Sequence, residues 1–175
     1  DDVITSSANK NFKENMTNQN YSLSVSQVLG RTSVLQVLYD FRVENGYTAS
    51  PYRKARVLRT DGTIQALPEN HPQTRNRNSF AVKYNYYLSP LKLALGSSLR
   101  YYLDSWRVQS WTIEQKATHD FAKWLSVALN IRYYTQSAAN FYQDKYASTN
   151  TLGPFYTGNK TLAAYDTYQV GIRPL

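Results

Sequence analysis

The chain of 175 residues contains no cysteine, only two histidines and a small share of charge, 18%. The absence of cysteine excludes a disulfide scaffold, a cysteine-ligated zinc site and thiol catalysis. No apolar run approaches the roughly 20 residues that a membrane-spanning helix needs, and the mean hydropathy is -0.57. A helical membrane protein is therefore excluded. This test does not exclude a membrane β-barrel, whose strands are apolar on one face only.

Tyrosine is abundant in this sequence. There are 16 Tyr, 6 Phe and 3 Trp, and 20 Lys and Arg against 12 Asp and Glu give a net charge of +8. Disordered chains are poor in aromatic residues and rich in charge, so this composition predicts a folded chain. The length corresponds to about one domain.

Apolar and polar residues alternate over most of the chain. Between positions 35 and 43 every odd residue is apolar, and only Leu38 breaks the pattern at the even positions. A period of two is typical of strands, because successive side chains point to opposite faces. Strong alternation covers 35–44, 78–88, 91–104 and 125–136, and weaker alternation covers 20–29, 107–118 and 162–172. The sequence thus predicts an all-β, antiparallel, up-and-down fold of about seven long strands.

The predicted strands are long, and their connections alternate between short and long. Several strands run to about ten residues or more, which is close to the roughly 9–11 that a tilted strand needs to cross a bilayer. Tight connections are expected at Gly30-Arg31, at Ser89-Pro90 and over 119–123, and long loops over 46–78 and 137–160. Outer-membrane barrels have short periplasmic turns and long external loops. The pattern therefore predicts a transmembrane β-barrel with both long loops outside.

This orientation implies that the seven strands are not a whole barrel. With periplasmic short turns, the first and the seventh strand both run inward, and 1–18 is expected to be the end of an external loop. Single-chain bacterial barrels have an even number of strands. We therefore expect 1–175 to be a single β-barrel domain that forms the C-terminal portion of a larger barrel.

Six segments of the chain carry a family resemblance. They are GYTASPYRK at 46–54, PE at 68–69, TRNR at 74–77, LRYY at 99–102, DSW at 104–106 and IRYYTQSAANFY at 131–142. Over about 20–172 the sequence resembles the C-terminal half of the domain-of-unknown-function 3570 family. The resemblance implies a Gram-negative outer-membrane protein and no assigned activity.

Eleven polar residues share the strand positions opposite the apolar rows. In a membrane barrel they line the lumen, because a charge on the lipid face costs roughly 2–4 kcal/mol at the midplane. An open lumen would select solutes by charge, whereas paired charges of mixed sign would plug it. The predicted lumen-lining residues are Asp40, Arg42, Glu44, Lys83, Asn85, Arg100, Asp104, Glu114, Lys116, Asn130 and Arg132.

Aromatic residues cluster near the ends of the predicted strands. Tyrosines beside cations also suit stacking with bases. Their position at strand ends instead favours a girdle at the headgroup level of a bilayer, so no nucleic-acid partner is expected. The predicted girdle consists of Tyr84, Tyr86, Tyr101, Trp111, Tyr133 and Tyr168.

The loop 46–78 is basic. Six cations and two carboxylates give it a net charge of +4, half of the net charge of the chain. Such a loop contacts lipopolysaccharide phosphates, guides anionic solutes or binds a partner, and other outer-membrane or periplasmic proteins are candidates. The predicted external basic residues are Arg53, Lys54, Arg56, Arg59, Arg75 and Arg77.

Catalysis has little support in the sequence. His71 falls in an external loop and His119 in a periplasmic turn, so an apolar band of roughly 25 Å separates them. No phosphate loop, metal spacing or haem motif is present. We expect no enzyme, no cofactor and no metal.

These observations predict a protein of the bacterial outer membrane that contacts the bilayer and lipopolysaccharide. It would serve as a channel, a transporter component or a scaffold for partners. The alternative is a soluble β-barrel that binds an apolar ligand with its apolar rows turned inward. Alternation alone does not decide between the two, because it does not label the faces.

Overall fold

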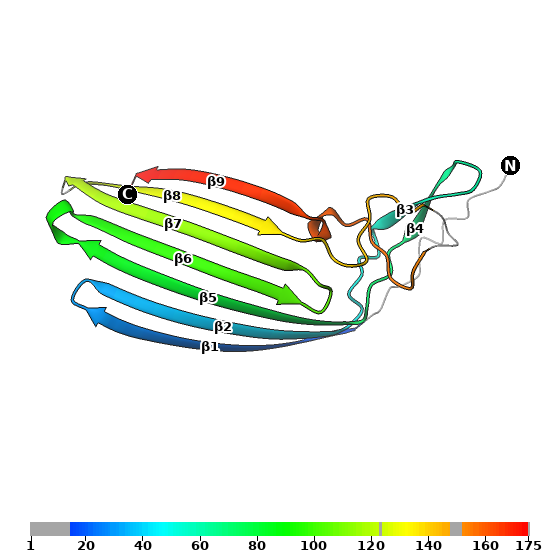
Figure 1. The fold of residues 1–175 in the computed structure, drawn as a ribbon, viewed down its shortest axis with the longest axis horizontal. Helices are drawn as coiled ribbons and strands as arrows, with labels where there is room; N and C mark the ends of the chain where they lie inside the picture. Colours follow the sequence, from blue (N-terminus) through cyan, green and yellow to red (C-terminus); the bar gives the residue numbers. More distant parts are fainter. Residues whose placement is uncertain (1–14, 123, 148–151, 175) are drawn as a thin grey trace.

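The structure, a computed structural model, describes residues 15–122, 124–147 and 152–174. Its main element is an antiparallel seven-stranded sheet in the order β1-β2-β5-β6-β7-β8-β9 (Figure 1). The strands are β1 Met16–Gly30, β2 Ser33–Gly46, β5 Thr74–Leu88, β6 Leu93–Asp104, β7 Gln109–Ala122, β8 Leu125–Gln136 and β9 Tyr165–Pro174. The predicted all-β class and the seven long up-and-down strands are confirmed.

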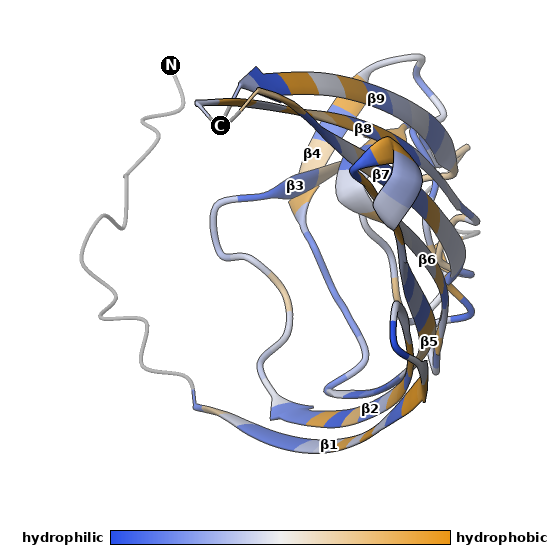
Figure 2. Ribbon diagram, turned by 90° about the vertical axis from the view of Figure 1, so that its left-hand side faces the viewer, coloured by the Kyte–Doolittle hydropathy of each residue, from blue (hydrophilic) through white to orange (hydrophobic). Residues whose placement is uncertain are grey.

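Within the described residues the sheet does not close into a barrel. β1 and β9 are its two edges, and each pairs with a single neighbour, β2 and β8 respectively. Figure 2 shows the sheet as a curved arc that is open on one side. Closure requires the first and last strands to meet, and at this curvature seven strands cover only part of a circle. The structure is therefore an open curved sheet and not the closed barrel expected of a complete barrel domain.

Short and long connections lie at opposite ends of the sheet (Figure 1). At one end are the tight turns after β1 and β7 and the short 3-10 turn Ser89–Leu91 between β5 and β6. At the other end are the turn 105–108, the long connection 47–73 and the segments 137–147 and 152–164. Of the predicted external segments, 1–14 and 148–151 lie outside the described residues.

The connection 46–78 is not a simple loop. It contains a hairpin of β3 Lys54–Leu58 and β4 Ile64–Pro68, and β5 begins at Thr74, four residues before the predicted strand. Residues 74–79 read TRNRNS and are polar on both faces, so no alternation marks them. They form a strand because their backbones pair with β2, where Asn45 lies opposite Thr74.

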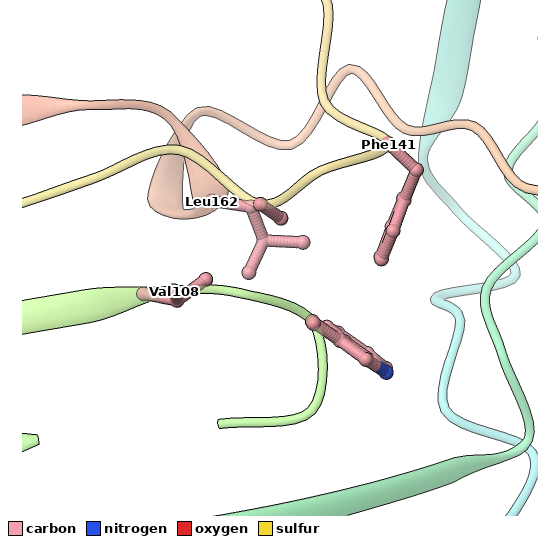
Figure 3. Close-up of a cluster of buried hydrophobic side chains, with 5 residues drawn as sticks. Val108, Phe141 and Leu162 are labelled. Atoms are coloured by element: carbon pink, nitrogen blue, oxygen red, sulfur yellow. The ribbon is translucent and has the colours of Figure 1, made fainter. Parts of the chain in front are cut away.

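Most of the buried apolar residues lie in the loops and not in the sheet. We call the segments 47–73, 105–108, 137–147 and 152–164 the cap. Figure 3 shows one cap cluster, which consists of Trp106, Val108, Ala139, Phe141 and Leu162. A second cluster is formed by Ala55, Val57 and Tyr146. Among the described residues of the seven-stranded sheet, the only buried hydrophobic residues are Ala81 and Ala128.

The cap clusters lead to a stability prediction. Phe141→Ala removes a buried ring that contacts Trp106 at 5.1 Å between centroids, and such a cavity costs about 3–5 kcal/mol. Hydrogen exchange of the amides of 139–146 should therefore accelerate by roughly two to three orders of magnitude. Phe155→Ala is the matched control, because that ring is 40% exposed. Equal exchange in both variants would show that the cluster does not hold the cap.

Candidate functional site

Register places the eleven predicted lumen residues on one face of the sheet. Lys83 of β5 lies opposite Gln36, Arg100 of β6 opposite Ala81, and Arg132 of β8 opposite Glu114, so the polar positions form continuous rows across the strands. The six predicted girdle residues lie on the other face. This division follows from the alternation, because every strand keeps its register over nearly its whole length.

A cavity of about 630 Å³ lies on the polar face. The sheet is a curved arc (Figure 2). The lining of the cavity comes from six strands of the sheet and from the cap, which puts the cavity on the inner, concave side of this arc. A convex sheet surface does not enclose such a volume. The lining residues are Asn20, Ser22, Asp40, Phe41, Arg42, Arg75, Arg77, Asn78, Ser79, Arg100, Tyr102, Val108, Ser110, Thr112, Arg132, Tyr134, Gln136, Thr161 and Leu162.

The structure brings only part of the predicted polar set together. Asp40, Arg42, Arg100 and Arg132 line the cavity near the cap. Asn85 and Lys116 line a separate hollow of about 270 Å³ near the turns. Lys83, Glu114 and Asn130 line neither, and Glu44 and Asp104 are buried beside arginines of the cap end.

Arg75 and Arg77 are sheet residues and not members of an external loop, which corrects their predicted placement. Both lie in β5 on the polar face. The Arg75 Nε donates to Asp104 Oδ2 at 2.9 Å, and Arg77 Nη2 lies 2.9 Å from Glu44 Oε2. Nothing in the sequence pairs these residues, because β5 and its partner carboxylates are far apart along the chain.

Asp104 organises the turn between β6 and β7. Its Oδ1 accepts hydrogen bonds from the backbone N–H groups of Trp106 and Val108, both at 2.9 Å, and its Oδ2 accepts from Tyr102 and Arg75. The Arg75 guanidinium also lies 4.1 Å from the centroid of the Trp106 ring. A buried carboxylate is stable only when it is paired and hydrogen-bonded in this way. Asp104 therefore joins the sheet to the cap and does not face the cavity.

The remaining predicted basic residues lie on or beside the β3–β4 hairpin. Arg53, Lys54, Arg56 and Arg59 are exposed, whereas Ala55 and Val57 of β3 point inward and are fully buried. Alternation along this short strand thus separates a cationic outer surface from an apolar inner one. Arg59 Nε donates to Gln65 Oε1 at 3.0 Å across the hairpin.

The aromatic residues of the convex face form ring pairs at two levels. Tyr101 and Trp111 lie 4.5 Å apart, and Tyr133 and Tyr168 lie 4.9 Å apart, on neighbouring strands nearer the cap. Tyr84 and Tyr86 stack at 6.3 Å nearer the turns. The two pairs nearer the cap are cross-strand contacts, which stabilise a sheet, whereas Tyr84 and Tyr86 lie on the same strand, β5.

A second buried group holds the two halves of the cap together. Glu69 Oε1 accepts from Thr157 Oγ1 at 2.8 Å and from the Gly158 N–H at 3.0 Å. His71 Nε2 lies 3.4 Å from Glu69 Oε2, and both atoms are buried without a hydrogen-bond partner in the part of the chain that the structure describes. His71 Nδ1 lies 3.2 Å from the carbonyl oxygen of Thr48. The contacts of Glu69 with Thr157 and Gly158 connect segments that are more than 80 residues apart.

Burial lowers the pKa of His71 below its ordinary value, and the neighbouring Glu69 carboxylate opposes this only in part. The other histidine is far from this group. His119 lies in β7 and not in a turn as predicted, and its ring packs against Phe121 with centroids 4.4 Å apart.

Several cavity residues were missed by sequence reasoning. Tyr102 and Tyr134 line the cavity, although the sequence offered them only as parts of the Arg-Tyr-Tyr motifs. Tyr102 and Tyr134 lie two residues after Arg100 and Arg132, so the alternation of the strand places them on the same, polar face. Glu69 and the cap aromatics had no such signal, because they lie outside any long alternating segment.

The described part of the chain contains no helix with the length and hydropathy of a membrane span. Over the same residues, no three or more His, Asp or Glu side chains gather as metal ligands would.

These features define an all-β protein with a polar concave face, an apolar convex face and a folded cap at one end of the sheet. The chain belongs to the family described as protein of unknown function DUF3570, whose family model matches residues 3–174. Searches of curated proteins and of solved structures found no match. The family resemblance expected from the sequence is confirmed.

The buried His71 leads to a prediction on pH. Its pKa is lowered from 6.5 on folding, so the unfolded chain binds more protons than the folded cap just below that value. The stability of the cap is therefore full above the unfolded pKa and falls as the pH drops below it. The midpoint temperature of thermal unfolding of the cap should therefore decrease as the pH is lowered from about 7.5 to about 5.

The matched variants for this test are His71→Gln and His119→Gln. His71→Gln should remove most of the decrease in the midpoint over this pH range, and His119→Gln should retain it. An unchanged pH dependence in His71→Gln would assign the effect to other groups.

Proposed function

We propose that the chain forms part of the wall of a β-barrel channel in the bacterial outer membrane, through which hydrophilic solutes pass. The observation that carries the proposal is the direction of curvature. The polar rows line the concave side with its cavity, and the apolar rows cover the convex side. Membrane barrels have this distribution, with a polar interior and an apolar outer band.

The convex apolar surface supports contact with lipid. One cross-strand row runs over all seven strands of the sheet as Val25, Val37, Val82, Leu99, Ile113, Tyr133 and Tyr168. Most of these side chains are exposed, Ile113 by 51%. Soluble monomers rarely expose an apolar patch of more than a few hundred Å². The strands, of 10 to 15 residues, also reach across a bilayer core.

Polar groups on the convex face pair with one another. Ser97 Oγ donates to Gln115 Oε1 at 2.6 Å, and Tyr133 Oη donates to Asp166 Oδ1 at 3.3 Å. Water cannot satisfy such groups inside a bilayer, so they need partners within the protein. The pairing of neighbours on this face is therefore the arrangement that a lipid environment requires.

The soluble alternative predicts the opposite distribution. A soluble barrel that binds an apolar ligand needs its apolar rows on the concave side, where this sheet has arginine, aspartate and serine. The curvature thus favours the membrane proposal. The two sheet edges support a larger barrel, because further strands would satisfy the unpaired backbone groups of β1 and β9.

Within this proposal the cap faces the outside of the cell. Long connections mark the external side of outer-membrane barrels, and tight turns mark the periplasmic side. The exposed cations of the hairpin then meet the phosphates of lipopolysaccharide, and the bilayer surrounds the convex face. The cap constricts one end of the channel.

The lipid-facing assignment gives a testable prediction. Leu99→Lys puts a charge into the central apolar row of the convex face, which costs about 2–4 kcal/mol in a bilayer. Ser98→Lys, one residue earlier on β6, points to the concave face between Lys83 and Glu114 and should be tolerated. The measurement is the folded fraction in outer-membrane vesicles, read from heat-modifiable migration in gels. Equal folding of both variants in vesicles, with Leu99→Lys no less stable, would contradict lipid contact.

Channel activity is tested in planar bilayers with the full-length protein. We expect discrete conductance steps, and replacement of Arg100 and Arg132 by Gln should shift the selectivity of the channel toward cations because it removes two positive charges from the lumen. If the protein folds and inserts into the membrane but shows no conductance, the channel proposal is overturned. The chain would then belong to a plugged barrel wall that binds partners. An unchanged selectivity would place the two arginines outside the conducting path.

A further inference from the structure

The cavity on the concave face carries more positive than negative charge. Five arginines line it, at positions 42, 75, 77, 100 and 132, and Asp40 is the single carboxylate in the lining. Asp104 pairs with Arg75, and Glu44 pairs with Arg77 and Arg42, so these carboxylates compensate the arginines at the cap end. Two guanidinium groups, Arg100 and Arg132, have no carboxylate partner within 4.0 Å among the described residues.

Neighbouring strands do not compensate these two charges. Arg100 lies opposite Ala81 on one side and Thr112 on the other. Arg132 lies opposite Glu114 in the register, but no ion pair within 4.0 Å joins the two side chains in the described part of the chain. Both arginines are exposed on the concave face and line the cavity.

Hydrogen-bond donors at the cap side of the cavity also lack partners. Within the described ranges of the chain, Arg42 Nε, Arg77 Nε and Ser79 Oγ are buried without a hydrogen bond, and all three residues line the cavity. Arg42 and Arg77 lie directly opposite each other on β2 and β5, and like charges in this position destabilise a sheet. Glu44 bridges them only partly, because its Oε1 is 3.5 Å from Arg42 Nε.

We propose that this cavity binds the oxyanion of a small hydrophilic solute, a phosphate or carboxylate group, through Arg100 and Arg132, beside the partly exposed side chains of Arg42 and Arg77. An anion supplies the acceptors that these groups lack, and guanidinium groups bind phosphate and carboxylate in bidentate geometry. The volume of about 630 Å³ is in the range of small-molecule sites. This inference rests on the proposed function, since it treats the cavity as part of the lumen, and it names the solute class of the channel.

The test uses the full-length protein in planar bilayers with chloride as the current carrier. Glucose 6-phosphate and inorganic phosphate should reduce the chloride current reversibly and saturably, and glucose should not. Replacement of Arg100 and Arg132 by Gln should raise the half-blocking concentration of phosphate at least about tenfold, because each lost charge-assisted contact contributes about 1.5–3 kcal/mol to binding.

The matched control replaces Lys83 and Lys116 by Gln. It removes two positive charges from the same face of the sheet but outside the cavity, so a local site leaves the block unchanged. If both double variants weaken the phosphate block equally, or if the block never saturates, the general charge of the lumen causes it and the proposed site is overturned. This result would leave the channel itself intact.

Calorimetric titration of folded protein in detergent with glucose 6-phosphate separates the two proposals when no conductance is found. Binding that is lost on replacement of Arg100 and Arg132 would support the site although the channel function fails. Absence of binding in folded protein would overturn the site directly.

Discussion

The direction in which the sheet curves determines which of its faces lies inside the arc and which lies outside. Alternation produces two faces, and the curve turns the polar face inward, where Asp40, Arg100 and Arg132 line a shared cavity. The apolar face is then outside and lacks a protein partner within the described residues. A sheet with this polarity gains little from burial in water, so its stability depends on its backbone ladders, on the cap and on an apolar environment.

The cap compensates for the missing core of the sheet. Trp106 and Phe141 pack there with Leu162, and the buried Asp104 attaches this cluster to the sheet through Arg75. Glu69 and Thr157 join the two long connections to each other. Each of these buried polar groups comes from a different part of the chain, so the cap is held together by contacts between segments that are distant in the sequence.

Sequence periodicity was informative where one face of a strand differs from the other. It located seven strands and divided Lys83, Arg100 and Arg132 from Tyr84, Tyr101 and Tyr133 correctly by parity. It was uninformative at TRNRNS, where both faces are polar, and there it assigned Arg75 and Arg77 to a loop. It also did not find the β3–β4 hairpin, whose five-residue strands are too short to stand out within a basic loop.

The sequence by itself determined the seven long strands, their polar and apolar faces and the family, because a period of two and a run of shared motifs are local properties. The tertiary structure decided which face is concave, which charges neutralise each other and which stay free, since these depend on curvature and on contacts between distant segments. Asp104 illustrates the difference. Its parity assigned it to the polar face, but only the folded turn shows that the carboxylate is buried among Trp106, Val108 and Arg75, whereas Arg100 and Arg132 face the cavity.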